Sequence, residues 1–204
     1  YAENFKYQLD SFNVDFKMLK GVFESSKSKQ FEFIGNVNYS PGTLIFPFFD
    51  LVNDKTQVKG SLSLLGKNNS FQDFNDNVKI ALSIDNSTLD VNALFPNKIK
   101  DVYEKPYEIS LTASGSLNNL SFQKILLQNE MLFFSGDLNF LHFFEEQETD
   151  WSAIIHDLKL SPKSFKDLET LSSVQKKIIK TMGMLQMRGE LSSQGDSLKM
   201  ALVS

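Results

Sequence analysis

The stretch Gly60-Ser-Leu-Ser-Leu-Leu65 decides the fold, and two similar stretches follow it, Gly115-Ser-Leu-Asn-Asn-Leu120 and Gly136-Asp-Leu-Asn-Phe-Leu141. Each of them follows a run in which apolar and polar residues alternate. Alternation with a period of two is typical of a β-strand with one apolar and one wet face. Glycine inside a strand permits a bulge or a sharp bend. The three stretches therefore predict corresponding strands of a curved sheet.

Similar alternation recurs in four other segments, at 31–37, 78–84, 107–113 and 185–191. Between 120 and 127 the alternation changes phase, because Phe122 and Ile125 have opposite parity. We expect a β-bulge near Gln123 and Lys124, since one extra residue would return both apolar residues to one face.

Other segments show the three-to-four residue spacing of an amphipathic helix. A long helix is predicted from Ser161 to Met182, followed by Gly183. A shorter helix is predicted over 87–95, where Ser87-Thr-Leu-Asp90 resembles a capping box. A further helical turn is predicted from Val14 to Lys20.

The chain also repeats at long range. Gly60 and Gly136 are 76 residues apart (136 − 60), and Ser87 and Ser164 are 77 apart (164 − 87). A fixed period of this kind indicates a repeat protein. We expect a single elongated module with approximate units at 14–86, 87–160 and, incomplete, 161–204. Because the chain opens on Tyr1 without the regions of a signal peptide, we expect it to be part of a larger protein.

The C-terminal half carries a family resemblance. Its apolar strands, acidic loop and helix containing Asp167-Leu168 together resemble the repeat unit of the TamB and AsmA-like family, on the segments Leu120–Leu127, Phe134–Leu138, Ile155–Leu160 and Met184–Leu191. The similarity is clearest over 107–204 and fainter over 31–106. It implies a β-taco, in which a long sheet is folded lengthwise into an apolar trough. It also implies a periplasmic place in an inner-membrane-anchored parent, with phospholipid or another acyl-chain ligand as a partner and an outer-membrane β-barrel as a further partner of the parent.

The alternation and helical spacings, together with what the resemblance implies, define the expected fold class. We expect a mostly β chain with an elongated, curved, antiparallel or meandering sheet that forms an apolar trough of the β-taco type. One long helix and one or two short helices should accompany the sheet.

Composition excludes several classes of function. The chain has 204 residues, of which 41% are hydrophobic and 23% charged, so it can bury a core. Its formal net charge of −4 carries no basic bias, which argues against a nucleic-acid partner. Cysteine is absent, so disulfides and thiolate metal sites are excluded. The longest apolar run, 43–52, is too short to cross a bilayer.

Catalytic residues are sparse. The only histidines, His142 and His156, lack the spacing of a metal site. No phosphate-binding loop or nucleophile motif occurs. The acidic run at 145–150 and the segment Asp73–Asn77 are interpreted as solvated turns. We therefore expect a protein that is not an enzyme and uses no metal or cofactor.

The aromatic residues point instead to an apolar surface, since there are 19 Phe against one Trp and five Tyr. A sheet with one apolar face must have it covered by a second layer, a partner or a lipid. Taken with the family resemblance, this leaves two expected functions. We expect the chain to be a segment of a lipid-transport bridge that holds phospholipid acyl chains; the alternative is a structural or protein-binding β-module in outer-membrane protein assembly without lipid cargo.

The apolar parity of each strand predicts which residues line the floor of the trough. They are Leu62, Leu64, Leu82, Ile84, Ile109, Leu111, Leu117, Phe122, Ile125, Phe134, Leu138, Phe140, Leu158, Met187 and Leu191.

Overall fold

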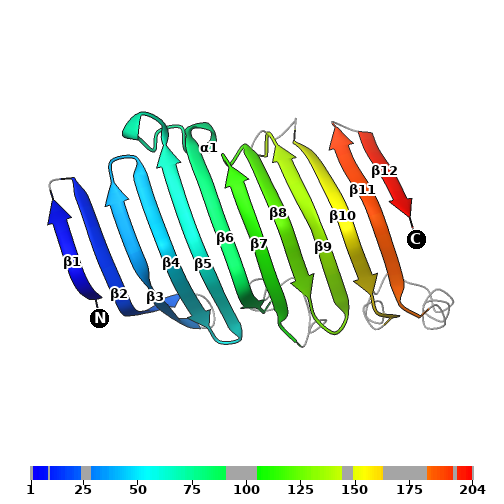
Figure 1. Cartoon of the computed structure of the whole chain (residues 1–204), viewed down its shortest axis with the longest axis horizontal. Helices are drawn as coiled ribbons and strands as arrows, with labels where there is room; N and C mark the ends of the chain where they lie inside the picture. The colour runs from blue at the N-terminus through cyan, green and yellow to red at the C-terminus, as the bar shows by residue number, and fades with distance from the viewer. Residues whose placement is uncertain are drawn as a thin grey trace.

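The computed structural model describes residues 2–8, 10–23, 29–90, 105–143, 149–162, 183–194 and 197–203. Within these residues the chain forms one open antiparallel sheet of 12 strands (Figure 1). The strands are β1 Ala2–Gln8, β2 Ser11–Phe23, β3 Lys29–Ser40, β4 Thr43–Asn53, β5 Thr56–Gly66, β6 Val78–Leu89, β7 Tyr107–Gly115, β8 Asn119–Gln128, β9 Leu132–Leu141, β10 Asp150–Leu160, β11 Leu185–Gln194 and β12 Ser197–Val203.

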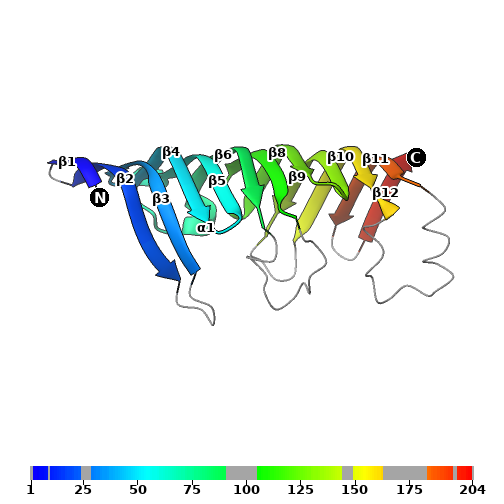
Figure 2. The ribbon, with the colours of Figure 1, turned by 90° about the horizontal axis from the view of Figure 1, so that it is seen from below.

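The sheet is a simple meander, because the order of the strands in space is their order in the sequence. The prediction of a mostly β chain with an antiparallel, meandering sheet is thereby confirmed. Neighbouring strands lie about 4.8 Å apart, so the 12 strands extend over roughly 50 Å. The long, narrow outline is visible in the view from below (Figure 2).

A line of β-bulges crosses the sheet. Each even-numbered strand from β2 to β10 has one extra residue relative to the strand that follows it, at 17–18, 47–48, 85–86, 123–124 and 156–157. A bulge bends its strand and increases the local twist. Since the bulges of successive even strands lie beside one another in the register, the sheet bends along a single line, which we call the crease.

The odd strands place glycine at the crease. These residues are Gly35 on β3, Gly60 on β5, Gly136 on β9 and Gly189 on β11. A Cβ atom on Gly60 would lie 1.9 Å from the carbonyl oxygen of Ser83 on β6. Such a distance is far below van der Waals contact, so the backbones approach closely only because no side chain is present. Among the odd strands from β3 to β11, β7 is the exception and carries Leu111 at this position.

This arrangement explains two of the three Gly-x-Leu stretches. Gly60 and Gly136 lie four strands apart and occupy the same place at the crease. Gly115 differs, since it is the last residue of β7 and has a φ of 128° that favours glycine. It begins the turn to β8 rather than marking the crease.

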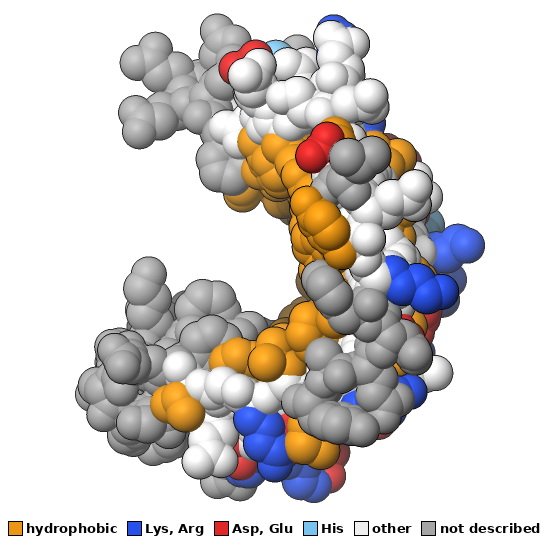
Figure 3. Space-filling model, turned by 90° about the vertical axis from the view of Figure 1, so that its left-hand side faces the viewer, with side chains coloured by type: hydrophobic (Ala, Val, Ile, Leu, Met, Phe, Trp, Pro, Cys, Tyr) orange, Lys and Arg blue, Asp and Glu red, His pale blue; other side chains and the backbone are white. Residues whose placement is uncertain are grey.

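The sheet is strongly curved along the direction of its strands, because each strand bends at the crease. Seen along the long axis, it has a C-shaped section around a hollow (Figure 3). Hydrophobic side chains gather on the concave side, whereas Lys, Arg, Asp and Glu lie toward the convex side and the ends of the strands. The crease and the alternation of side chains together produce this separation.

The connection between β5 and β6 makes hydrogen bonds to neighbouring turns at one end of the strands. It contains the short helices η1 (Lys67–Asn69) and α1 (Phe74–Asn77). On one side the amide of Gly66 donates to the carbonyl oxygen of Gly42, at 2.6 Å. On the other side the side-chain amide of Asn118 donates to Asp76 Oδ1, at 2.8 Å. The connection therefore ties together the turns of three successive hairpins.

Two helix predictions are wrong in the part of the chain that the structure describes, and the first is the short helix predicted over 87–95. Ser87 and Leu89 belong to β6 and pair with Ile109 and Tyr107. The Ser87 hydroxyl does not cap a helix; its oxygen accepts a hydrogen bond from the Lys59 amide, at 2.8 Å. The rest of the predicted helix, 91–95, lies outside the described residues, as does 163–182 of the predicted long helix.

The turn predicted from Val14 to Lys20 lies within β2. Its apolar residues Phe16 and Leu19 are three apart because the bulge at 17–18 separates them, and this spacing resembles that of a helix. By contrast, the bulge predicted near Gln123 and Lys124 is confirmed, and Lys124 has a φ of 53°.

Substitution of a crease glycine should destabilise the sheet. Gly60→Ala places Cβ against the Ser83 carbonyl, so the strands must separate, and we expect the free energy of unfolding to fall by about 1–3 kcal/mol. Urea denaturation followed by circular dichroism measures this change. Ser114→Ala, on the exposed side of β7, is the matched control. Equal stability of the two variants would contradict a crease that excludes side chains.

The hydrogen bond between the β5–β6 connection and the β7–β8 turn leads to a second prediction. Asn118→Ala removes the hydrogen bond to Asp76 in a site where Asn118 is 5% exposed. We expect a loss of about 1 kcal/mol in the free energy of unfolding. The neighbouring exposed residue supplies the control, because Asn119→Ala should change stability by less than about 0.5 kcal/mol. An unchanged free energy of unfolding in Asn118→Ala would show that this hydrogen bond does not stabilise the turns at this end of the strands.

Candidate functional site

The concave face of the described sheet extends across its strands as a continuous surface. Residues directly opposite each other in an antiparallel pair point to the same side of the sheet. One unbroken row of such partners crosses nine strands and is apolar throughout: Phe46, Leu62, Leu82, Ala113, Phe122, Leu138, Ala153, Leu191 and Met200. The face is therefore continuous from β4 to β12 without a polar interruption in this row.

A second apolar row lies on the other side of the crease. It consists of Ile109, Leu127, Phe134, Leu158 and Met187. The phase change in β8 is essential to this row, because the bulge at 123–124 allows Phe122 and Leu127 to face the same side. Without that extra residue one of the two rows would point to the convex side.

The register brings nearly all the predicted floor residues together. Leu62, Leu82, Phe122, Leu138 and Leu191 lie in the first row, and Ile109, Phe134, Leu158 and Met187 lie in the second. The adjoining positions on the same face are occupied by Leu64, Ile84, Leu111, Ile125 and Phe140. Leu117 is the exception, since it lies in the turn between β7 and β8.

Sequence reasoning missed the part of this face that precedes Leu62. Strands β2 to β4 contribute a set of neighbouring aromatic rings. Phe12 stacks on Tyr39 with ring centroids 5.1 Å apart, and Phe33 makes edge contacts with Phe16 at 5.9 Å and Phe46 at 6.3 Å. The alternation at 31–37 indicated the position of Phe33. In β2 and β4 the bulges change the parity of the apolar residues within the strand, so alternation does not show which residues share a face.

Charge is nearly absent from the concave face. Among the paired positions of β2–β12 on this side whose side chains the structure describes, none is charged. The polar residues there include Asn53, Thr56, Ser87 and Ser193. Within the described ranges, no group of three His, Asp or Glu is placed to hold a metal ion. The face is therefore suited to hydrocarbon rather than to a charged ligand.

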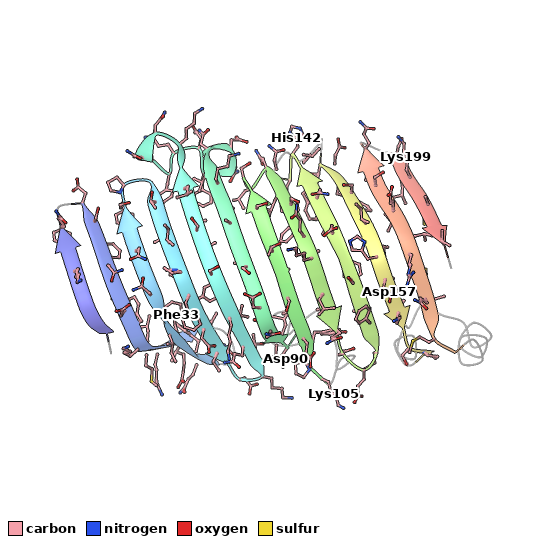
Figure 4. All side chains as sticks on the ribbon, in the orientation of Figure 1. Phe33, Asp90, Lys105, His142, Asp157 and Lys199 are labelled. Carbon is pink, nitrogen blue, oxygen red and sulfur yellow. The ribbon has the colours of Figure 1, made fainter. Side chains whose placement is uncertain are left out.

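The convex face carries the ionic interactions. Lys20 Nζ lies 2.7 Å from Glu32 Oε1, and His156 Nε2 lies 2.9 Å from Asp137 Oδ2. Asp157 on β10 (Figure 4) accepts a hydrogen bond from Gln186 Nε2 at 2.8 Å. Lys159 Nζ lies 2.9 Å from its other carboxylate oxygen. Hydrogen bonds from Lys159 and Gln186 lower the pKa of Asp157.

The concave side chains are only half-buried. Phe46, Leu62 and Phe134 are examples of large residues that keep part of their surface exposed. Among the described residues, the buried apolar side chains are a small and mainly smaller-sized set, Val14, Val37, Val78, Ile84, Tyr107, Ala113, Ala153 and Ile155. Thr56 and Ser87 are the buried polar residues of this face. In the described part of the chain, the strands make extensive contacts only with their neighbours in the sheet. Apolar surface thus remains accessible inside the C-shaped section (Figure 3).

Comparisons of this chain with protein-family models, curated proteins and solved structures gave no significant match. Among the described residues, the helices are too short to cross a membrane.

The convex ion pairs yield a pH prediction. Because the folded-state pKa of Asp157 lies below its ordinary value of 3.8, its stabilising effect is present at neutral pH and is lost as pH falls through the folded-state value. Gln186→Leu should raise this pKa toward 3.8, since a hydrogen bond to the carboxylate disappears. Titration of the Asp157 carboxyl carbon by NMR measures the shift. Lys79→Ala, on β6, should leave it unchanged.

Proposed function

We propose that the chain is a segment of a periplasmic lipid-transport bridge and that its concave face is a β-taco-type trough for phospholipid acyl chains. The parent protein would be anchored in the inner membrane and carry lipid between the inner and outer membranes. The observation that carries the proposal is the continuous, half-exposed and almost charge-free apolar face. The resemblance of 107–204 to the TamB and AsmA-like repeat supports the cellular setting.

The energetics favour an acyl chain as the occupant. Removing hydrocarbon from water contributes about 0.8 kcal/mol per methylene group. Each step along the row from Phe46 to Met200 offers another apolar side chain of similar character. A chain that moves by one strand therefore exchanges one apolar contact for an equivalent one and is not exposed to water. The headgroup remains in water at the open side of the hollow (Figure 3).

The dimensions are also appropriate. The hydrocarbon core of a bilayer is about 30 Å thick and contains two acyl chains end to end, so one chain needs roughly 15 Å. The face extends over roughly 50 Å across the strands. A single module would hold about three acyl chains in a line, and a longer array would hold proportionally more.

A structural or protein-binding β-module without lipid cargo is the second candidate. It is favoured by the ring contacts of β2–β4, because Phe16, Phe33 and Phe46 partly cover one another. In that case a client protein of outer-membrane assembly, such as an outer-membrane β-barrel, would supply the cover. The two candidates differ in whether lipid occupies the face from β5 onward.

Site-specific photo-crosslinking discriminates between them. Crosslinkers at Leu111 and Phe134 lie on the concave face, and one at Ser114 lies on the convex face of β7. In the intact parent, or in the chain incubated with phosphatidylethanolamine vesicles, we expect phospholipid adducts at 111 and 134 but not at 114. Equal labelling at all three positions, or labelling at none, would contradict lipid carriage and favour the protein-binding module.

A charge on the concave face should interrupt the apolar path. In Leu111→Asp an unpaired carboxylate replaces hydrocarbon, which costs several kcal/mol when an acyl chain covers it. We expect native mass spectrometry to show less co-purified phospholipid than for Ser114→Asp, which places the same charge on the convex side. Circular dichroism must show that both variants remain folded. Unchanged lipid content in folded Leu111→Asp would overturn the proposal.

A further inference from the structure

The bulge of β8 is held from the convex side by the strand that follows it. Its two residues, Gln123 and Lys124, lie opposite the single residue Asp137 on β9. The Lys124 amide donates to Asp137 Oδ1, at 2.8 Å. A carboxylate therefore accepts a backbone hydrogen bond at the point where the ladder between the two strands is interrupted.

The other oxygen of the same carboxylate lies at the bulge of β10. His156 is the extra residue of β10 relative to β9, and its Nε2 lies 2.9 Å from Asp137 Oδ2. Strands β8, β9 and β10 are neighbours in the sheet (Figure 1). Asp137 thus joins the backbone of one bulge to the side chain of the next.

The backbone of Lys124 explains why its amide needs a partner. Lys124 has a φ of 53°, a left-handed conformation that is unfavourable for a long side chain and that asparagine tolerates. In the bulge of β6, Asn86 has a φ of 42°, and its amide donates to the residue opposite it on β7, at Ser110 Oγ and 3.1 Å. The other three bulges of the crease contain no residue with a positive φ. Both left-handed bulge residues are therefore held by a side-chain acceptor on the next strand.

The apolar rows do not by themselves fix the place of the bulge in β8. If the extra residue lay at 125–126 instead, Phe122 and Leu127 would still face the hollow, and both rows would be unchanged. Two residues would change sides, because Ile125 would move to the convex face and Lys124 would face the hollow. The place of the bulge therefore decides whether a charged side chain enters the concave face.

Two effects oppose each other in this choice. The apolar side chain of Ile125 favours the observed bulge, whereas the left-handed backbone of Lys124 disfavours it. We propose that Asp137 is a positioning residue for the trough: by binding the Lys124 amide it fixes the bulge of β8, which keeps Ile125 on the concave face and the side chain of Lys124 off it. The positioning role needs no ligand, whereas its consequence, an acyl path free of charge, rests on the proposed function.

NMR on the full chain tests the position of the bulge. Ile125 and Leu111 lie on neighbouring strands of the concave face, so their methyl groups should give a nuclear Overhauser effect. In Asp137→Ala we expect loss of this contact and of the left-handed Cα chemical shift of Lys124. Asp137→Asn retains an acceptor oxygen for the amide and should preserve both signals. Asp157→Ala, which removes a convex carboxylate bonded to side chains, is the matched control and should also preserve them.

Glycine at position 124 provides the rescue. Glycine adopts a positive φ without steric cost, so the bulge of Lys124→Gly no longer needs the carboxylate. In Lys124→Gly/Asp137→Ala we therefore expect the contact between Ile125 and Leu111 to return. An effect of Asp137→Ala that came only from the lost contact with His156 would not be reversed in this way. Absence of rescue, or an unchanged contact in Asp137→Ala, would overturn the proposal.

Circular dichroism shows whether each variant is folded. If Asp137→Ala does not fold, Lys124→Gly/Asp137→Ala should fold, since the strain that the carboxylate offsets is then absent. Failure of both variants to fold would also overturn the proposal.

Phospholipid content separates the positioning role from the proposed function. After incubation with phosphatidylethanolamine vesicles, native mass spectrometry should show less phospholipid on Asp137→Ala than on Asp137→Asn, and Lys124→Gly/Asp137→Ala should regain it. If the unmodified chain binds no phospholipid while the NMR contact responds as expected, the proposed function fails and the positioning role is supported. If the unmodified chain binds phospholipid but the contact does not respond to Asp137→Ala, the positioning role is refuted and the proposed function stands.

Discussion

The crease is the constraint on which the rest of the structure depends. Two backbones can approach closely there because one strand has an extra residue and its neighbour has no side chain, as Gly60 shows beside Ser83. The bulge shifts the phase of the even strand, so residues on both sides of the bend face the hollow. The curvature and the alignment of the apolar rows on one face both follow from this alternation of bulged and glycine-containing strands.

Most strands were recognisable from the sequence because their alternation is regular between bulges. The segments at 78–84, 107–113 and 185–191 are all strands, and the bulge in β8 could be predicted since apolar residues continue in the opposite parity beyond it. The helix predictions failed at bulges, because the residues around a bulge have the spacing or the residue types of a helix. Phe16 and Leu19 acquire helical spacing, and Ser87 resembles a helix cap although its hydroxyl bonds the backbone beside a bulge.

The same physical reason limited prediction of the concave face. From Leu62 onward the apolar residues that parity selects share one face of the sheet, except for Leu117 in a turn. In β4 the run Leu44-Ile-Phe-Pro-Phe-Phe49 is apolar at every position, so parity carries no information, and only the register shows that Phe46 and Phe49 share a face across the bulge. The long-range period is also misleading in part: Ile84 corresponds at the crease to Ile155, and Gly60 to Gly136, with different separations in sequence.

The pairing of each strand with its sequence neighbours alone makes the molecule quasi-one-dimensional, as in solenoid proteins. Because a bulged strand must lie beside a glycine-containing strand, the smallest insertion that preserves the crease is one pair of strands. Such a pair adds about 9.6 Å, twice the spacing between strands. The length of an array built in this way can therefore change only in fixed steps, and each step leaves the cross-section, the crease and the existing rows unaltered. The number of hairpins therefore determines the length of the array, independently of which side chains line the concave face.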